Sequence, residues 1–277
     1  MINKFFVFVL QLGKKTVDDD LFSLSNELAY KILLSFFPFL IFLVTLLGFL
    51  RLEDSPVVHQ LFELLPDDIG YVIENFVTGL QAQPQAGLLS FSLLVSMYSA
   101  SNGFKAIVRG VNKAHGYHDG RSLLKKTALS LGLMLIFTFS IITMLVLWIF
   151  SDAIIAALQH LVPFDTLMLV RVASAGIALA VLIGTTSWMY YLACAQRGEC
   201  RIFPGACATV ALWAISSNIF GIYISRFTNI SLIYGSLAGI FILIIWINLI
   251  SFFLLFGNTI NALLNKKDKK DNHHSPL

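Results

Sequence analysis

The chain has 277 residues, of which 57% are hydrophobic and only 13% are charged, and its mean hydropathy is +0.79. A soluble domain carries about 25% charged residues, so this composition excludes an ordinary soluble protein and indicates an integral membrane protein. The formal net charge of +3 is small, and the positions of the basic residues along the chain are more informative than their total.

The N-terminal residues 1–12 form a short apolar run without a small-residue cleavage site, so we expect an amphipathic helix at the membrane surface and no removed signal peptide. Five later stretches are apolar over about 20 residues or more, enough to cross a bilayer. They are residues 28–50, 127–150, 166–195, 203–224 and 232–264. A basic cytoplasmic tail, residues 265–277, follows them and is expected to be disordered.

A sixth crossing is predicted for the polar, Gly- and Ser-containing stretch that begins at Gly87. Residues 87–104 carry no charge, and 18 residues span roughly 27 Å as a helix, close to the ~30 Å bilayer core. With six crossings and the N-terminus inside, 16 of the 19 basic residues face the cytosol, and only Arg51, Arg171 and Arg226 do not. The sequence therefore predicts an all-α protein with six transmembrane helices, both termini in the cytosol, and one membrane domain over residues 1–264.

Between the first and second crossings lies an acidic outer segment, residues 53–82. Ser55 and Pro56 are typical of a helix start, Pro66 ends that helix, and the apolar positions that follow recur at helical spacing. We therefore expect two short amphipathic helices on the outer face, either covering an opening between the membrane helices or packing at the interface.

Polar and helix-breaking residues inside the predicted spans are candidates for a polar path or a hinge. Pro38 should kink the first span because it leaves the Leu34 carbonyl without its helical partner, which Ser35 is placed to satisfy. Asn218, Asn248 and Asn258 each either make an interhelical hydrogen bond or contribute to a polar path.

Small residues at four-residue spacing predict close helix packing, because small side chains let helix backbones approach each other in lipid. We expect Gly103, Gly235 and Gly239 to lie at such packing sites, and Gly257 to allow a bend in the last span. Most of these contacts are expected within one chain. A homodimer through Gly235 and Gly239 is the alternative that is not favoured.

Ionisable residues gather at the cytoplasmic ends of the first two spans. Glu27 and Lys31 lie four residues apart, as do Lys105 and Arg109, so Glu27 is expected to pair across the helices with one of the latter two. Together with Asn102, these residues form either a structural ion pair or a site for an anionic head group.

No residue pattern indicates catalysis, a metal or a cofactor. The three cysteines, Cys194, Cys200 and Cys207, are odd in number and lack CxxC spacing, so they indicate small buried residues rather than a disulfide framework or a metal site. No nucleophile elbow, phosphate-binding loop, zinc-protease motif or paired-acid arrangement occurs, and no nucleic-acid module is present. The sequence therefore predicts a protein that is not an enzyme and does not bind nucleic acid.

Four sequence blocks are similar to those of the YihY/BrkB family of bacterial inner-membrane proteins. They are "LSNELAYKILLSFFPFLIFLVTLLG", "MYSASNGFKAIVRGVNKAHGYHDGRSLLKK", "FPGACATVALWAISSNIFGIYISRF" and "IYGSLAGIFILIIWINLISFFLLFGNTINALL", and the resemblance covers about residues 24–264. Asn112 is one of the residues that carry it, and we group Asn112 with the head-group candidates. The family commonly has an acidic residue where this chain has Thr259, so a role that needs that carboxylate is not expected here. The resemblance implies six membrane helices with both termini in the cytosol, and it leaves the function open.

The hypothesis that accommodates these features best is a transporter-like protein that moves or presents an amphiphile such as a phospholipid. The alternative is a non-catalytic scaffold in which the acidic outer loop binds an envelope partner. An older ribonuclease label in the family is disfavoured because the residues that RNA cleavage needs are not found.

Overall fold

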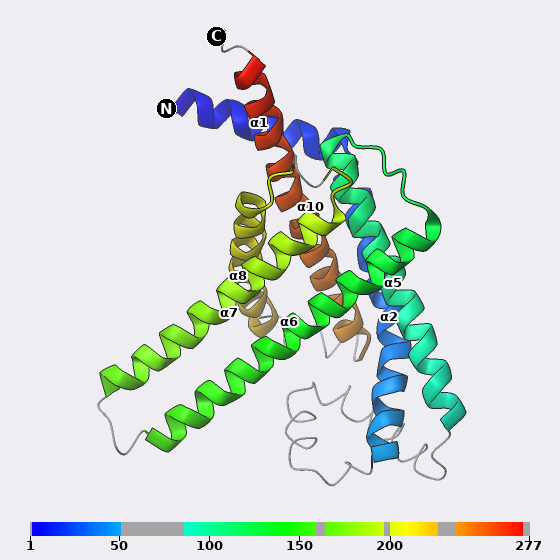
Figure 1. Cartoon of the computed structure of the whole chain (residues 1–277). Helices are drawn as coiled ribbons and strands as arrows, with labels where there is room; N and C mark the ends of the chain where they lie inside the picture. Colours follow the sequence, from blue (N-terminus) through cyan, green and yellow to red (C-terminus); the bar gives the residue numbers. More distant parts are fainter. Residues whose placement is uncertain (1, 51–85, 159–163, 197–199, 227–235, 274–277) are drawn as a thin grey trace.

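The computed structural model describes residues 2–50, 86–158, 164–196, 200–226 and 236–273. These residues form seven helices (Figure 1): α1 (Ile2–Asp18), α2 (Leu21–Leu50), α5 (Ala86–His115), α6 (Leu123–Leu158), α7 (Phe164–Ala193), α8 (Phe203–Arg226) and α10 (Ser236–His273). The described ranges contain no strand, so the all-α prediction is confirmed for them. The predicted outer helices in 53–82, and Gly235, lie outside the described residues.

Four of the helices contain a segment that is long and apolar enough to cross a membrane. These segments are Leu123–Met144, Met168–Ala193, Phe203–Tyr223 and Phe241–Lys266. Each overlaps one of the crossings predicted from the sequence, which confirms a membrane protein with at least these four hydrophobic helices among the described residues.

The N-terminal helix α1 is longer than its apolar run and ends where the chain turns into α2. Asp20 adopts a positive φ of 52°, a left-handed conformation that Asp tolerates better than most residues. Phe6 and Leu10 of α1 are exposed, whereas Leu12 is buried toward the bundle. The helix therefore presents apolar side chains outward as well as inward, as a surface-lying amphipathic helix does.

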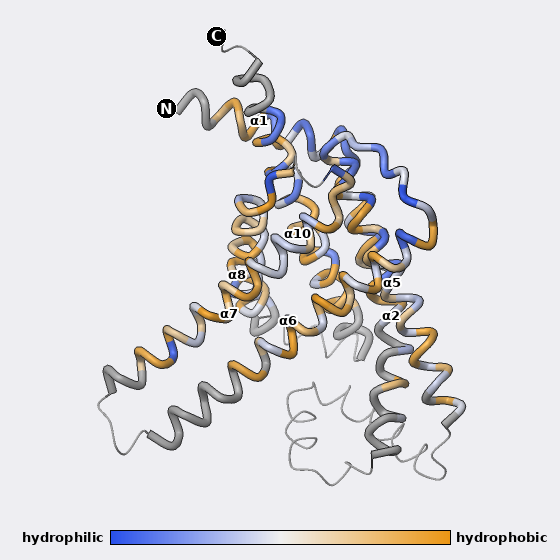
Figure 2. Tube along the Cα trace, viewed as in Figure 1, coloured by the Kyte–Doolittle hydropathy of each residue, from blue (hydrophilic) through white to orange (hydrophobic). Residues whose placement is uncertain are grey.

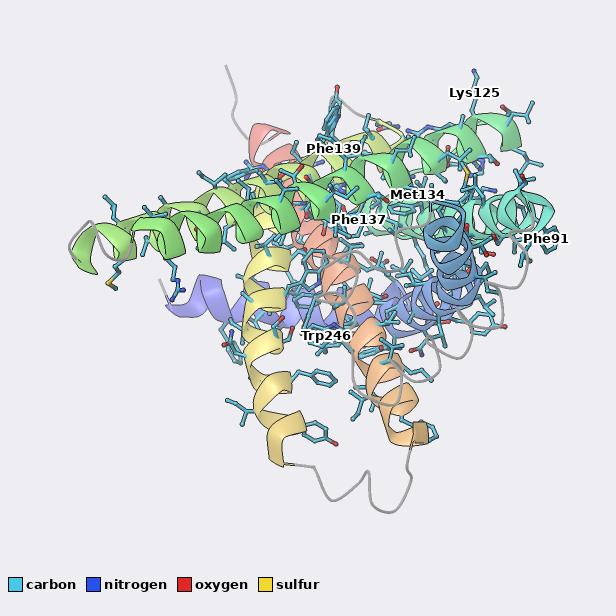
Figure 3. All side chains as sticks on the ribbon, turned by 90° about the horizontal axis from the view of Figure 1, so that it is seen from below. Phe91, Lys125, Met134, Phe137, Phe139 and Trp246 are labelled. Carbon is cyan, nitrogen blue, oxygen red and sulfur yellow. A yellow bond between two sulfur atoms is a disulfide. The ribbon has the colours of Figure 1, made fainter. Side chains whose placement is uncertain are left out.

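The long helices converge at the end of the molecule that carries both termini and diverge toward the other end (Figure 1). The α6–α7 pair leans away from the α2–α5 pair, and hydrophilic residues gather at the converging end (Figure 2). We call this the inner end. The apolar arms below it expose side chains such as Phe91 at 66% and Phe139 at 72% (Figure 3), as expected for surfaces solvated by lipid.

The buried core lies near the inner end and draws on all the helices except α1. Val111 of α5, Leu133 of α6 and Tyr190 of α7 are among its most buried members. Phe104 and Phe137 pack edge to face between α5 and α6, and Phe220 stacks on Trp246 between α8 and α10.

Helices α8 and α10 cross at two glycines that meet backbone to backbone. A Cβ built on Gly257 would lie 1.9 Å from the Oγ1 of Thr209, and one on Gly205 would lie 2.1 Å from the Gly257 carbonyl oxygen. Gly257 was predicted as a bend, but its role in the structure is this close crossing. Gly103 faces Lys31 and Ile32 of α2 at ordinary contact distance, 3.9 Å, while Gly239 lies in the first turns of α10.

The C-terminal residues depart from the expected disordered tail. Helix α10 continues without interruption to His273, so residues 265–273 of the expected tail are helical in the structure. The reason is that Lys and Asn can extend an existing helix at little cost once its costly first turn has formed.

Candidate functional site

The carboxylate of Glu27 links α2 to α5 at the inner end. Its Oε1 accepts hydrogen bonds from the Nζ of Lys31 at 2.5 Å and from the Nη2 of Arg109. Lys31 lies one turn further along α2, whereas Arg109 reaches across from α5. Of the two partners that the sequence offered for Glu27 across the helices, the structure selects Arg109.

Lys105 turns along its own helix instead. Its Nζ donates to the Oδ1 of Asn102 at 3.3 Å and lies 6.0 Å from the centre of the Tyr98 ring, at the outer limit of a cation–π contact. Asn102 and Lys105 thereby occupy the turns of α5 next to Arg109.

We call Glu27, Lys31, Asn102, Lys105 and Arg109 the inner-end cluster. It contains three cations and one carboxylate, so its net charge is positive. The side chain of Arg109 is 53% exposed, against 37% for Glu27 and 23% for Lys31. More than half of the Arg109 side chain is therefore exposed while its guanidinium pairs with Glu27.

A double-mutant cycle on Glu27→Gln and Arg109→Gln should show coupling. Because both side chains are well exposed, we expect the double variant to be less destabilised than the sum of the single variants by about 0.5 kcal/mol. Thermal unfolding of the purified protein in detergent measures this. Lys105→Met is the matched control, and its effect should add to that of Glu27→Gln; coupling to Lys105 in place of Arg109 would contradict the pairing.

Asn248 makes the interhelical bond that its position suggested. Its Nδ2 donates to the Oδ1 of Asn26 on α2, and one turn away the rings of Phe22 and Phe252 stack with centroids 5.0 Å apart. Since Asn26 precedes Glu27, α10 is fastened to α2 beside the inner-end cluster.

The other candidates for a polar path do not join Asn248. Asn218 is exposed and its Nδ2 donates to the carbonyl oxygen of Ala214 in its own helix, 2.7 Å away. Ser35 donates to Ile32 at 2.7 Å, so the expectation that it bonds the Leu34 carbonyl is wrong. Helix α2 runs unbroken past Pro38. These contacts do not connect Ser35, Asn218 and Asn248 into a path.

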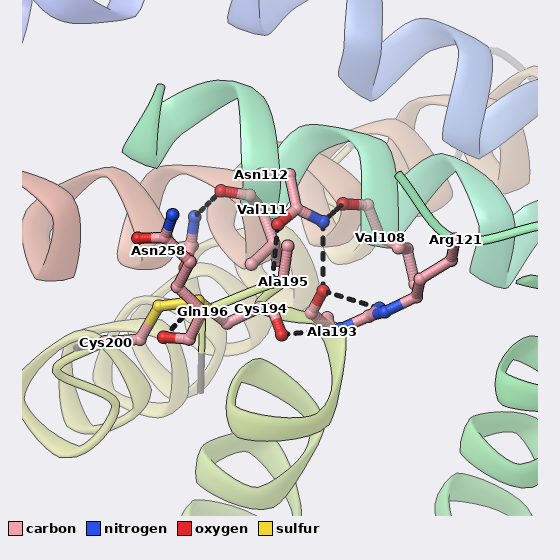
Figure 4. The surroundings of a disulfide bond; sticks show 10 residues. All are labelled: Val108, Val111, Asn112, Arg121, Ala193, Cys194, Ala195, Gln196, Cys200 and Asn258. Atoms are coloured by element: carbon pink, nitrogen blue, oxygen red, sulfur yellow. Dashed lines mark hydrogen bonds between the residues drawn. A yellow bond between two sulfur atoms is a disulfide. The ribbon is translucent and has the colours of Figure 1, made fainter. Parts of the chain in front are cut away.

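Asn112 lies in a different place from the inner-end cluster. It is buried where the end of α5 meets the end of α7, and its Nδ2 donates to Val108 at 2.8 Å and to the Ala193 carbonyl at 3.0 Å. Its Oδ1 accepts the Ala195 amide at 2.7 Å (Figure 4). The structure thus places Asn112 apart from the other head-group candidates, with its side-chain amide hydrogen-bonded at a helix end.

Arg121, from the α5–α6 connection, completes the same helix end. It donates to the carbonyls of Ala193 at 3.3 Å and Cys194 at 2.7 Å (Figure 4). The last carbonyls of a helix lack internal partners and carry partial negative charge, so a guanidinium stabilises them. We call Asn112 and Arg121, with the α7 end that they hold, the helix-end junction.

Helix α10 supplies further polar contacts at the same level. Asn258 donates to the Val111 carbonyl of α5 at 3.3 Å. Asn261 accepts the Gly205 amide at 2.6 Å and donates to Ile202 at 3.0 Å, and so caps the start of α8. Asn258 thus belongs to helix packing at the junction and not to a path with Asn218 and Asn248.

Three of these residues were missed from the sequence. In the sequence, Arg121 is one of several basic residues in a loop. Asn261 is one polar residue near the end of a long helix. Tyr190 looked like one aromatic among many, yet its hydroxyl donates to the Leu254 carbonyl at 2.5 Å and bonds Thr209 at 2.8 Å. The hydroxyl of a buried Tyr needs a hydrogen-bond partner, and this general requirement was the only indication that the sequence offered.

The expectation for the cysteines is wrong in one respect. Cys194 and Cys200 form a disulfide (Figure 4). Cys207 is free. The number and spacing of the cysteines did not indicate this pairing, because the ends of two different helices bring the two residues together. Within the described ranges, no group of three or more His, Cys, Asp or Glu side chains is placed to hold a metal ion.

Comparison with known proteins agrees with the resemblance. Residues 12–276 match the family described as Virulence factor BrkB. The chain is 35% identical over 250 residues to the putative ribonuclease-like protein YfkH of Bacillus subtilis, covering 89% of this chain and 91% of that protein. It is also 26% identical over 279 residues to a UPF0761 membrane protein of Alteromonas mediterranea, covering 95% of this chain and 90% of that one.

A UPF0761 membrane protein of Vibrio parahaemolyticus is 27% identical over 280 residues, covering 94% of this chain and 83% of that one. No solved structure matches. The family match over nearly the whole length, the apolar helices and the similarity to these membrane proteins lead to one conclusion: the chain belongs to the BrkB family of membrane proteins.

Proposed function

We propose that the protein binds the phosphate-bearing head group of an amphiphile, such as a phospholipid, at the inner-end cluster and moves or presents it in the membrane. The observation that carries this proposal is the state of Arg109. Its side chain is 53% exposed, which makes it the most exposed cation of this net-positive group. Arg binds phosphate bidentately, so the cluster suits a phosphate better than a neutral head group.

We further propose six crossings, with α2 and α5 as the first two, and both termini in the cytosol of a bacterial inner membrane. Two features support this orientation. Both termini lie at the inner end, and the hydrophilic residues gather there (Figures 1 and 2). Basic residues are retained on the cytoplasmic side of such membranes.

The depth of the inner-end cluster fits a head-group site. Glu27 and Arg109 belong to helices whose remaining length points toward the diverging, apolar end of the molecule. Long basic side chains at such a position extend toward the phosphate layer of the membrane. A lipid phosphate at this level would compete with the Glu27 carboxylate for Arg109.

Reconstitution tests the proposal. Wild-type protein in liposomes that contain a fluorescent phospholipid should accelerate movement of the label between leaflets, measured by chemical quenching of the outer leaflet. Arg109→Gln should weaken the interaction by roughly 10- to 150-fold, because a charge-assisted hydrogen bond contributes about 1.5–3 kcal/mol.

Lys113→Gln is the matched control. Lys113 lies one turn beyond Arg109 on α5 and pairs at 3.2 Å with Asp20, the residue just before α2, so its replacement removes the same charge from the same helix without touching the cluster. Equal loss in both variants would point to general surface charge. No movement above that in empty vesicles, with folded protein, would reject transport.

The scaffold alternative has a different signature. A scaffold should yield one stoichiometric crosslinked partner through residues 53–82 and no lipid movement. We propose no catalytic role and no nucleic-acid substrate, although the name of the Bacillus subtilis relative contains the word ribonuclease. Metal-dependent RNA cleavage by nuclease-depleted, purified protein would overturn that view.

A further inference from the structure

The disulfide between Cys194 and Cys200 joins the end of one helix to the start of the next. Cys194 directly follows the last residue of α7, and Cys200 stands three residues before α8 begins. Their Cα atoms are 6.7 Å apart, within the range of disulfide-bonded pairs. The bond therefore closes the α7–α8 connection at the inner end (Figure 4).

Contacts that do not involve sulfur fix each of the two cysteines in place. On the Cys194 side, Arg121 and Asn112 hold the backbone at residues 193–195. On the Cys200 side, the start of α8 is capped by Asn261, and Cys200 itself packs against the buried core. Because none of these contacts involves sulfur, we expect them to keep the two thiols close when the bond is broken.

The two sulfurs have different surroundings. Cys194 is fully buried, whereas Cys200 is partly exposed. Cys200 stands just before the N-terminus of α8, and this end of a helix favours a negative charge. Cys194 follows the C-terminus of α7, which disfavours one. Cys200 is thus the attacking sulfur and Cys194 the resolving one.

We propose that Cys194 and Cys200 form a reversible dithiol–disulfide site that exchanges with a low-molecular-weight disulfide of the glutathione class. The Cys200 thiolate attacks that disulfide, releases one thiol and forms a mixed disulfide; the Cys194 thiol, losing its proton, then displaces the second thiol. Two protein thiols are oxidised and one small disulfide is reduced to two thiols. The cytosolic location rests on the proposed orientation, and disulfides in bacterial cytosol are typically transient rather than permanent.

Oxidation at this site ties the end of α7 to the start of α8. The bond closes a short loop within the α7–α8 connection, next to the α7 end that Asn112 and Arg121 hold. The reduced protein keeps the peptide connection, the hydrogen bonds and the packing but loses this loop closure, so amide exchange around residues 193–195 and 202–206 should be faster in the reduced state.

A redox titration tests the proposal. Purified protein is equilibrated in buffers of varying reduced-to-oxidised glutathione ratio, quenched with acid, alkylated with N-ethylmaleimide, digested and analysed by mass spectrometry. The peptide pair linked through Cys194 and Cys200 should appear as the buffer becomes oxidising and disappear on return to excess dithiothreitol, without unfolding. Cys207→Ser should titrate identically, and Cys200→Ser should give no linked pair.

Three outcomes would overturn the site: alkylation of both thiols at every ratio, a bond that dithiothreitol cannot reduce in the folded protein, or linkage through Cys207. Sidedness is measured on the Cys194→Ser, Cys207→Ser double variant with a membrane-impermeant maleimide, which should label Cys200 in inside-out vesicles. Labelling from the opposite side alone would overturn the orientation and the cytosolic exchange together. Absence of oxidation with correct labelling would overturn the exchange and leave the orientation standing.

Discussion

Replacing Gly257 by alanine should abolish the native packing of α8 against α10. The added Cβ would lie 1.9 Å from the Thr209 hydroxyl oxygen and 2.5 Å from the Gly205 carbonyl oxygen. The second of these is backbone and cannot rotate away, so the helices must separate. Overpacking commonly costs 1–3 kcal/mol, and a backbone clash at a buried crossing should cost about 3 kcal/mol or more. Fluorescence-detected size-exclusion chromatography of the membrane extract should show little monodisperse protein.

Gly221→Ala is the control for this prediction. Gly221 also lies in α8, but a Cβ there meets nothing within 4 Å. Alanine is a better helix former than glycine by about 1 kcal/mol, so this variant should be as stable as the parent or slightly more so. Normal yield and unfolding temperature for Gly257→Ala would show that the two helices do not cross at these glycines.

Replacing Asn112 by alanine should give the second largest loss of stability. The substitution removes bonds to the Val108 and Ala193 carbonyls and leaves the Ala195 amide without its acceptor, in a buried site. An unsatisfied buried group costs about 1–3 kcal/mol. Since Arg121 still satisfies Ala193, we expect a total of about 2–4 kcal/mol, measured by thermal unfolding in detergent.

Two further variants separate the hydrogen bonds from general polarity. Asn218→Ala removes an asparagine that bonds only its own helix on an exposed face, so its effect should be within about 0.5 kcal/mol. Asn112→Asp keeps the acceptor for Ala195 but loses both donors, and it should be at least as damaging as Asn112→Ala because it also buries a carboxyl group. Equal stability of Asn112→Ala and Asn218→Ala would refute a closing role for Asn112.

Composition and hydropathy were sufficient to predict the class of protein and most of the helices. Four apolar segments fall where the sequence placed them, because the bilayer imposes a length and polarity requirement that is local to each helix. The pairing of Glu27 was narrowed to two partners by charge and depth alone. The choice of Arg109 over Lys105 depends on how α2 and α5 are rotated about their axes, which a single sequence does not determine.

The arrangement of the polar groups could not be predicted in the same way. Asn112, Asn218, Asn248 and Asn258 look equivalent in sequence, yet one closes a helix end, one bonds its own turn and two bridge helices. The Cys194–Cys200 bond likewise depends on where two helix ends meet. Tertiary packing determines such contacts, so they cannot be predicted from residue spacing or composition.

The convergence of the helices at the inner end makes the α6–α7 pair a lever. Ser140 and Thr185 bond at 2.9 Å and help α6 and α7 move together, while the pair meets the rest of the bundle near its inner end. Helix α6 has 36 residues, which at 1.5 Å per residue is about 54 Å. A rotation of about 10° at the junction would therefore carry the far tip through about 9 Å. A small rotation where Asn112 and Arg121 hold the end of α7 would thus be amplified into a large displacement at the far end of the pair.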